Sequence, residues 1–170
     1  MLHRAAAYNV SANPGILAPA IRDMRQADVA CIAALEREAY DFPWTPGIFR
    51  DCLLAGYTSL VLEHHRAIRA YAVMSVAAGE AHLLNLCVAV DSRREGHGRR
   101  LLETVLERAS LAGAGRMHLE VRPSNDAALA LYLASGFERI GIRRRYYRAR
   151  TGSEDAVLLA RALERRPRRR

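Results

Sequence analysis

A glycine-bearing loop, Arg93-Arg94-Glu95-Gly96-His97-Gly98-Arg99, is the part of this 170-residue chain best suited to bind an anionic ligand. An apolar run ends near Val90 before the loop, and an amphipathic helical pattern begins at Arg99 after it. The first amides of a helix have no partner within the helix, and the helix dipole favours negative charge there. Gly96 and Gly98 have no Cβ, so the backbone can approach a ligand closely. We therefore expect a phosphorylated molecule to bind at this loop.

Three further residues stand out by their positions. Residues 116–122 alternate between apolar and polar side chains, and Glu120 lies on the polar face of this predicted strand. A glutamate in a central strand is unusual, because burying a charge is costly and tends to raise the pKa. Asn125 and Tyr132 are two helical turns apart and project from one helix face. Glu120 and Tyr132 also have a purely structural interpretation. Glu120 would then be a solvated side chain paired with Arg122, and Tyr132 would be a core residue whose hydroxyl has a hydrogen-bond partner.

The elements that position these residues form a predicted mixed α/β fold. The expected order is β-α-α-β-β-β-α-β-α-β-β, with helices on both faces of the sheet. The apolar strand before the glycine loop is expected to be central, and the crossover helix makes residues 116–122 parallel to it. Strands are predicted at residues 17–24, 57–63, 67–77, 81–90, 116–122, 137–147 and 156–162, and helices at 28–39, 45–54, 99–112 and 125–135.

Composition limits the cellular setting. The net charge is +8, and the chain has no lysine. No apolar run approaches the ~20 residues of a membrane span, and the three cysteines form no C-x-x-C pair, so we expect a cytoplasmic protein that does not enter membranes. One domain is predicted at 17–163, between an N-terminal extension, 1–16, and a basic tail, 164–170. The extension is read as disordered rather than as a transit peptide. The tail either contacts a polyanion such as RNA or is simply solvated.

Other phosphate-binding motifs fit the loop poorly. A P-loop requires a lysine, which the chain lacks. A dinucleotide fingerprint requires a third glycine where Leu101 stands. The adjacent His64 and His65 suggest a metal pair, but neighbours on a turn rarely bind one ion, so we predict no metal.

The loop does fit the pattern [Q/R]-x-x-G-x-[G/A] between a strand and an amphipathic helix. It resembles the acyl-CoA signature of the GNAT (GCN5-related) N-acetyltransferases, and the predicted element order is similar to that family. Within the family, the chain resembles the RimI subfamily, although Ala89-Val90 replaces the usual Asp-Pro. The segments that carry this likeness are Phe42-Pro43-Trp44, Asn85-Leu86-Cys87-Val88, Leu119-Glu120-Val121-Arg122-x-Ser124-Asn125, Ala130-Leu131-Tyr132, Gly136-Phe137, Arg144-x-Tyr146-Tyr147 and Glu154-Asp155-Ala156.

The resemblance implies acetyl-CoA as co-substrate and direct acetyl transfer to an amine. Glu120 is then the general base and Tyr132 the general acid. Cys87 is expected to pack inertly rather than to carry the acetyl group. The expected acetyl-CoA contacts are Leu86, Cys87, Val88, Arg93, Arg94, Glu95, Gly96, His97, Gly98, Arg99 and Asn125. The expected substrate contacts are Phe42, Trp44, Tyr146 and Tyr147, although Phe42 and Trp44 fit a hydrophobic plug equally well.

RimI enzymes acetylate the N-terminal alanine of the small-subunit ribosomal protein numbered eighteen, and this is the activity we expect. A GNAT enzyme acting on other protein N-termini, on lysine or on a small-molecule amine is the near alternative. A non-catalytic GNAT-like module that docks on RNA or on a protein complex is the alternative from a different class.

Overall fold

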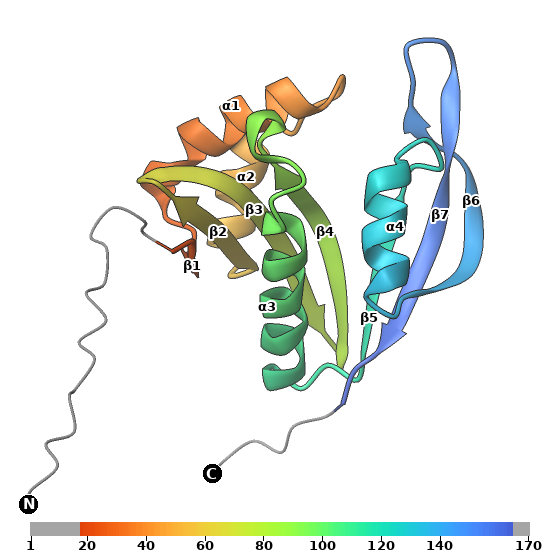
Figure 1. Cartoon of the computed structure of the whole chain (residues 1–170). Coiled ribbons are helices and arrows are strands. Elements are labelled where there is room, and N and C mark those ends of the chain that lie inside the picture. The colour runs from red at the N-terminus through yellow and green to blue at the C-terminus, as the bar shows by residue number, and fades with distance from the viewer. Residues whose placement is uncertain (1–17, 165–170) are drawn as a thin grey trace, which may run out of the picture.

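A computed structural model describes residues 18–164, which form a seven-stranded mixed sheet flanked by helices (Figure 1). The strand order is β1-β2-β3-β4-β5-β7-β6, and only β4 and β5 are parallel neighbours, as predicted. The elements are β1 (Ala20–Asp23), the short 3-10 helix η1 (Gln26–Asp28), α1 (Val29–Ala39), α2 (Pro46–Leu54), β2 (Thr58–His64), β3 (Ala67–Ala77), β4 (Glu80–Val88), η2 (Val90–Ser92), α3 (His97–Leu111), β5 (Arg116–Val121), α4 (Asp126–Ala134), β6 (Glu138–Arg148) and β7 (Ser153–Ala162).

The predicted N-terminal extension and nearly all of the predicted basic tail lie outside the described residues. Within residues 18–164, no helix is long and apolar enough to cross a membrane.

Two helices, α2 and α4, begin directly after cap residues of the types that favour a helix start. Thr45 precedes α2, with Pro46 at the first helical position, and its side chain accepts a hydrogen bond from the Ile48 amide at 3.4 Å. Asn125 precedes α4, and its side chain accepts a hydrogen bond from the Ala128 amide at 3.2 Å. These caps fix where both helices begin, and α4 lines the site described below.

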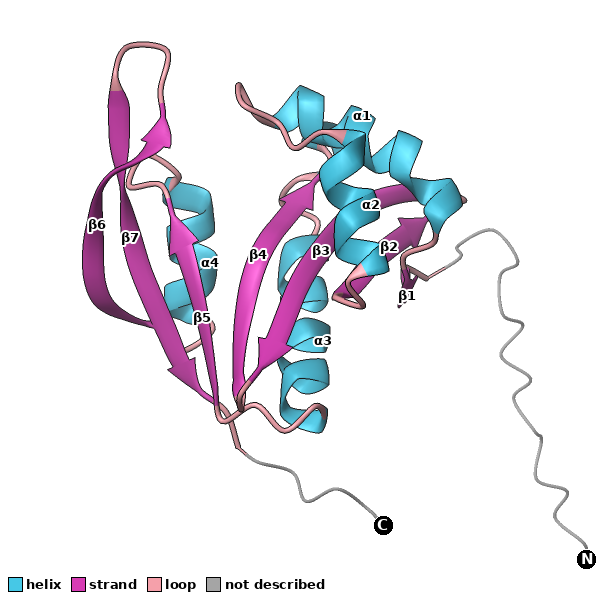
Figure 2. Ribbon diagram, turned by 180° about the vertical axis from the view of Figure 1, so that it is seen from behind, coloured by secondary structure: helices cyan, strands magenta, loops and turns pink. Residues whose placement is uncertain are grey.

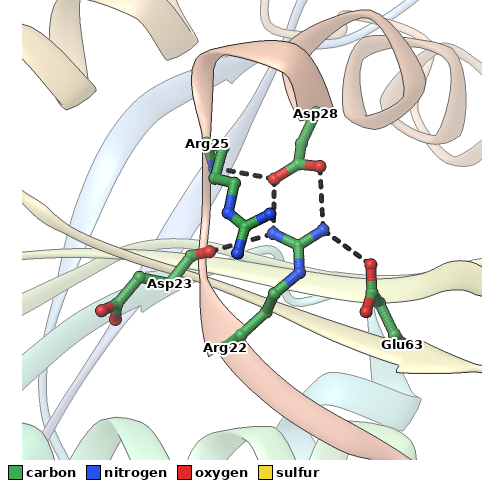
Figure 3. Close-up of polar contacts among 5 residues, drawn as sticks. All are labelled: Arg22, Asp23, Arg25, Asp28 and Glu63. Carbon is green, nitrogen blue, oxygen red and sulfur yellow. Dashed lines mark hydrogen bonds and ion pairs between the residues drawn. The ribbon is translucent and has the colours of Figure 1, made fainter.

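Asp28 directly precedes α1, a position at which an aspartate commonly caps a helix. Its carboxylate makes no cap hydrogen bond to α1 but accepts two from the Arg22 guanidinium, at 2.6 and 2.9 Å (Figure 3). It also accepts one from the Arg25 amide at 2.7 Å, and Arg22 reaches Glu63 of β2 at 2.6 Å. The arginine holds the pKa of Asp28 below its usual range, chiefly through these side-chain hydrogen bonds. This network therefore ties the entry to α1 to the edge of the sheet.

The helices lie on both faces of the sheet, as predicted, but they do not cover both faces equally (Figure 2). Helices α1 and α2 pack over the β2–β3 half of one face, and α3 and α4 lie on the other. On the first face, β5, β7 and β6 have no helix over them (Figure 2). The core under α3 and α4 includes Leu62, Met74, Leu101, Leu102 and Leu119. The core under α1 and α2 includes Ile32, Phe49, Val61, Tyr71 and Val73.

Strand β4 contains a β-bulge at Leu84, which has no partner between the residues paired with Met74 and Val73 of β3. Leu83, before the bulge, packs in the core under α3, whereas Cys87 packs in the core under α1 and α2. In a regular strand both odd-numbered residues would face the same way. The bulge therefore reverses the two faces of β4 and leaves Leu84 41% exposed. The prediction that this strand is central is confirmed, but its burial on both faces is incomplete.

The parallel pairing of β4 and β5 ends early. It runs from Glu80 opposite Arg116 to Leu83 opposite Leu119, and no pairing between the two strands continues beyond that point. Beyond it, β4 stays paired with β3 and β5 with β7, so the two strands diverge (Figure 2). The backbone groups of each strand that face the gap are left without a strand partner.

Candidate active site

A cleft of about 640 Å³ lies where β4 and β5 diverge. Its floor comes from the β4 residues around Leu84 and the β5 residues around Glu120, and α1 with its following loop, α4 and the β6–β7 hairpin supply the remaining walls. Of the predicted site residues, the cleft is lined by Phe42, Trp44, Leu86, Glu120, Asn125, Tyr132, Tyr146 and Tyr147. The structure thus gathers the predicted proton-transfer residues and the predicted substrate aromatics around one space.

Glu120 extends from β5 into this cleft. Its neighbours Leu119 and Val121 are buried in the core, as the alternation predicted. The carboxylate forms an ion pair with Arg143 of β6 at 2.8 Å, and its side chain is 27% exposed. A hydrogen bond with Glu120 is also the main cause of the raised pKa of Tyr146. The carboxylate is therefore held by side chains of β6 while still facing solvent in the cleft.

The alternative pairing of Glu120 with Arg122 is not seen. Arg122 instead donates to Glu154 of β7 at 3.0 Å and to the Arg148 carbonyl at 2.9 Å. Its guanidinium also lies over the Tyr147 ring, 4.4 Å from the ring centroid. Arg122 therefore contacts residues of the β6–β7 hairpin, and Glu120 pairs with Arg143 instead.

Tyr132 projects from α4 and is both a core residue and a cleft residue. Its ring packs against Phe137 at 5.8 Å, and 7% of the residue is exposed. Burial, and secondarily Tyr147, raises the pKa of its hydroxyl well above the ordinary value, so the hydroxyl keeps its proton. No residue among 18–164 forms a hydrogen bond with this hydroxyl, contrary to the alternative of a satisfied core tyrosine. A protonated hydroxyl at the cleft can donate to a leaving group.

The predicted substrate aromatics come from two facing segments, the loop after α1 and strand β6. Arg148 stacks over the Phe42 ring, 5.2 Å from its centroid, and joins the two segments. At the same cleft, Arg150 of the β6–β7 hairpin forms a two-point ion pair with Asp41, at 2.6 and 3.0 Å. Phe42 is 39% exposed, so it does not serve as a buried hydrophobic plug. The loop and the hairpin together narrow one side of the cleft.

Sequence reasoning missed a buried carboxyl group at the same cleft. Glu36 of α1 is 2% exposed and accepts hydrogen bonds from the Trp44 amide at 3.0 Å and from Asn85 Nδ2 at 3.2 Å. The Tyr71 hydroxyl also donates to it. The available signal was its helical spacing, because Val29, Ile32, Ala33 and Glu36 are the buried residues of α1. A carboxylate in the apolar stripe of a helix marks a place where polar groups must converge.

The glycine loop lies beside the C-terminal end of β4, near Val88, rather than on the cleft wall. Helix α3 begins at His97, two residues earlier than expected, because Gly96 adopts the left-handed conformation with φ of +82° just before it. At Gly98 an added Cβ would lie 3.3 Å from a Val88 methyl group, so the start of α3 packs closely on β4. The loop from Arg93 to Arg99 does not line the cleft, and neither do Cys87 and Val88.

Cys87 is turned away from the cleft, into the core under α1 and α2. Burial raises the pKa of its thiol to about 12, and Glu36 contributes to the shift. A thiol rather than a thiolate therefore stands at this position at neutral pH, and a thiol is a poor nucleophile. This supports the prediction of a packing role.

Comparisons with known proteins match this arrangement. Residues 21–137 match the model of the acetyltransferase (GNAT) family. The [ribosomal protein bS18]-alanine N-acetyltransferase of Escherichia coli K12 is 36% identical over 140 residues, which cover 82% of this chain and 95% of that protein. The N-alpha-acetyltransferase RimI of Mycobacterium tuberculosis is 36% identical over 139 residues, covering 74% of this chain and 82% of that protein. The crystal structure of the E. coli ribosomal-protein-S18-alanine N-acetyltransferase superposes with a TM-score of 0.81 at 34% identity, covering 86% of this chain and 95% of that one. The chain therefore belongs to the acetyltransferase (GNAT) family.

Proposed function

We propose that this protein transfers the acetyl group of acetyl-CoA to the N-terminal alanine of ribosomal protein bS18. The observation that carries the proposal is the cleft between the diverging strands β4 and β5, which brings Glu120 and Tyr132 to one space. The E. coli relative that carries the name of this activity matches 82% of the chain and supports the proposal.

The two catalytic roles follow from the chemistry of amide formation. The amine must lose a proton, its nitrogen attacks the thioester carbonyl, the C–S bond breaks, and the CoA sulfur takes up a proton. Glu120 accepts the proton from the amine, directly or through water, and an α-amine with a pKa near ~8 needs only a modest base. Tyr132, whose hydroxyl is protonated and free of protein partners within residues 18–164, gives its proton to the sulfur.

The side of the cleft proposed to bind acetyl-CoA, the acetyl donor, offers two kinds of contact. The backbone of β4 beyond Leu83 has no β5 partner and can pair with the extended pantetheine arm, with Leu86 at the cleft and Cys87 and Val88 following. The loop from Arg93 to Arg99 is the place for the pyrophosphate, because the free amides at the start of α3 point there. Asn125 uses its side-chain oxygen to cap α4, so its contact with the cofactor is proposed through its free side-chain amide.

The side of the cleft proposed to bind the peptide, the acetyl acceptor, continues across the face of β5, β7 and β6 that no helix covers (Figure 2). A second hollow of about 340 Å³ shares Trp44, Glu120, Tyr146 and Tyr147 with the cleft. Away from the shared residues it is lined by His82, His118, Ile140, Arg143, Leu158 and Leu159. We place the peptide residues that follow the acetylated alanine along this hollow, with Phe42 and Trp44 on the other side of the entrance. The described cysteines Cys31, Cys52 and Cys87 are all free thiols, which supports a cytoplasmic setting.

A mass measurement tests the proposal. The protein is incubated with acetyl-CoA and a synthetic peptide with the N-terminal sequence of bS18, and the expected product is heavier by one acetyl group. The same peptide with a blocked N-terminus is the matched control. Acetylation of the blocked peptide would redirect the proposal to lysine side chains, and no transfer to any peptide would overturn it.

Variants separate the named roles. Glu120→Gln should lower turnover about 10²–10⁴-fold, the range expected when a general base is removed. Glu138→Gln, at an exposed glutamate at the start of β6, is the control and should keep normal turnover. Full activity of the Glu120 variant would remove this residue from the mechanism.

A further inference from the structure

Two histidines and a glutamate from distant parts of the sequence meet beside the loop before α3. His64 is the last residue of β2, His97 is the first residue of α3, and Glu95 lies in the loop between η2 and α3. One possible ligand atom from each residue lies within 4.8 Å of the other two. Glu95 and His97 belong to the loop proposed above for the pyrophosphate, but that proposal uses the backbone amides at the start of α3 and leaves the three side chains without a role.

His97 provides a second, independent observation. Its side chain is 4% exposed, and its buried Nε2 atom has no hydrogen-bond partner among residues 18–164. That atom nevertheless lies 3.1 Å from Glu95 Oε2, so the pair has the separation of a hydrogen bond without its geometry. A buried polar atom without a partner is costly and needs a physical explanation.

Metal coordination explains this contact. Two atoms bound to one ion at about 2.1 Å lie about 3.0–3.4 Å apart and point at the ion rather than at each other. The distance between His97 Nε2 and Glu95 Oε2 falls in this range, and the His64 ring meets the His97 ring edge-on, with centroids 5.3 Å apart. Two imidazoles and one carboxylate are a donor set that Zn²⁺ uses in proteins, with water as the fourth ligand.

We propose that the protein binds one Zn²⁺ ion between His64, Glu95 and His97. The ion would cross-link the turn between β2 and β3 to the loop before α3, and so restrain the motion of that loop. The neighbouring His65 is not a ligand, because its exposed ring stacks on His64 with centroids 4.0 Å apart. The sequence prediction considered His64 and His65 as a pair, whereas the fold gives His64 a different partner from α3.

Zinc titration of the purified full-length protein tests the proposal without acetyl-CoA or peptide, so its outcome is independent of the acetyltransferase assay. Competition with a chromophoric chelator measures the affinity, and the visible spectrum of Co²⁺ reports the coordination geometry. The experiment is done in a Cys31→Ser background, because Cys31 is an exposed free thiol and a thiolate is a zinc ligand, so its removal leaves the proposed site as the source of the signal. We expect one equivalent to bind and the midpoint of thermal unfolding to rise with zinc concentration.

His64→Gln and Glu95→Gln should each weaken binding at least about 10–100-fold, the loss seen even when only a supporting group of a metal site is removed. His65→Gln is the matched control on the same turn and should bind like the parent protein. Both test variants are at positions that are not fully buried, so loss of folding does not obscure the result. Equal affinity in the parent and in the two test variants would overturn the proposal, as would the absence of stoichiometric binding.

Discussion

Replacing Glu36 is the sharpest test of how the cleft is held together. This carboxyl group joins three parts of the site: the Trp44 amide in the loop after α1, Asn85 on β4 beyond the bulge, and Tyr71 on β3. All three groups donate hydrogen bonds to its two carboxylate oxygens. Glu36→Leu keeps the size and helix propensity of the side chain but removes both acceptors, whereas Glu36→Gln keeps one carbonyl oxygen.

The size of the effect follows from burial. A buried donor left without a partner costs about 1–3 kcal/mol. The Tyr71 hydroxyl belongs to a fully buried residue and cannot find water, whereas Trp44 and Asn85 are partly exposed and can be partly hydrated. We therefore expect Glu36→Leu to lower the free energy of unfolding by about 2–5 kcal/mol, and Glu36→Gln by about 1–3 kcal/mol. The same changes release Trp44 and its loop, so kcat/KM for the peptide should fall by up to about 10²-fold through a raised KM.

Urea unfolding gives the stabilities, and steady-state kinetics with varied peptide give the KM. Glu103→Leu, at an exposed glutamate on α3, is the control and should change neither quantity. If Glu36→Leu proved as stable as the parent, the hydrogen bonds at Glu36 would be energetically unimportant. If it lost stability but kept the parent KM, the anchoring of the loop would be irrelevant to peptide binding.

Three further predictions concern single groups. Tyr132→Phe should lower kcat about 10²–10⁴-fold while leaving the midpoint of thermal unfolding nearly unchanged, because only a hydroxyl without a protein partner is removed; unchanged kcat would exclude it as the acid. Cys87→Ala should keep acetyl transfer within a few-fold and lower the free energy of unfolding by about 1 kcal/mol; total loss of transfer would favour a covalent route. Because the pKa of Asp28 is lowered in the folded protein, its contribution to stability is present above the ordinary pKa of about 3.9 and is lost as the pH falls through the folded value. Asp28→Asn should therefore destabilise the protein at pH 7 and match the parent in strong acid; a difference that is independent of pH would show that the ion pair with Arg22 is not its source.

Local patterns in the sequence were sufficient to predict the elements. Caps such as Thr45 and Asn125 act over three residues, so their effect can be read directly from the chain. The period-two alternation around Glu120 placed that residue correctly on the open face of β5. The family resemblance then supplied the roles of Glu120 and Tyr132, and the structure brings both residues to the cleft, although their roles stay predictions until they are tested.

Contacts between distant segments could not be read in this way. The partner of Glu120 is Arg143, which lies on a strand two positions away in the sheet rather than two residues along the chain. The burial of Glu36 depends on Tyr71 and Asn85, and each lies more than 30 residues away in the sequence. No local pattern encodes which strand will lie opposite a given side chain. The charged and hydrogen-bonding partners of the site residues could therefore be identified only from the three-dimensional structure.

The β-bulge at Leu84 accounts for several of these long-range features at once. It lies directly after Leu83, where pairing with β5 ends, so the strand changes its facing at the point where the cleft opens. Because of this change, Asn85 faces α1 and can donate to Glu36. In an unbulged β4, Asn85 would face the core under α3, where an unpaired amide is costly, and Glu36 would lose a donor. The bulge thus couples two requirements of the proposed reaction: β4 backbone groups without a β5 partner where acetyl-CoA is proposed to bind, and an anchored loop where the peptide is proposed to bind.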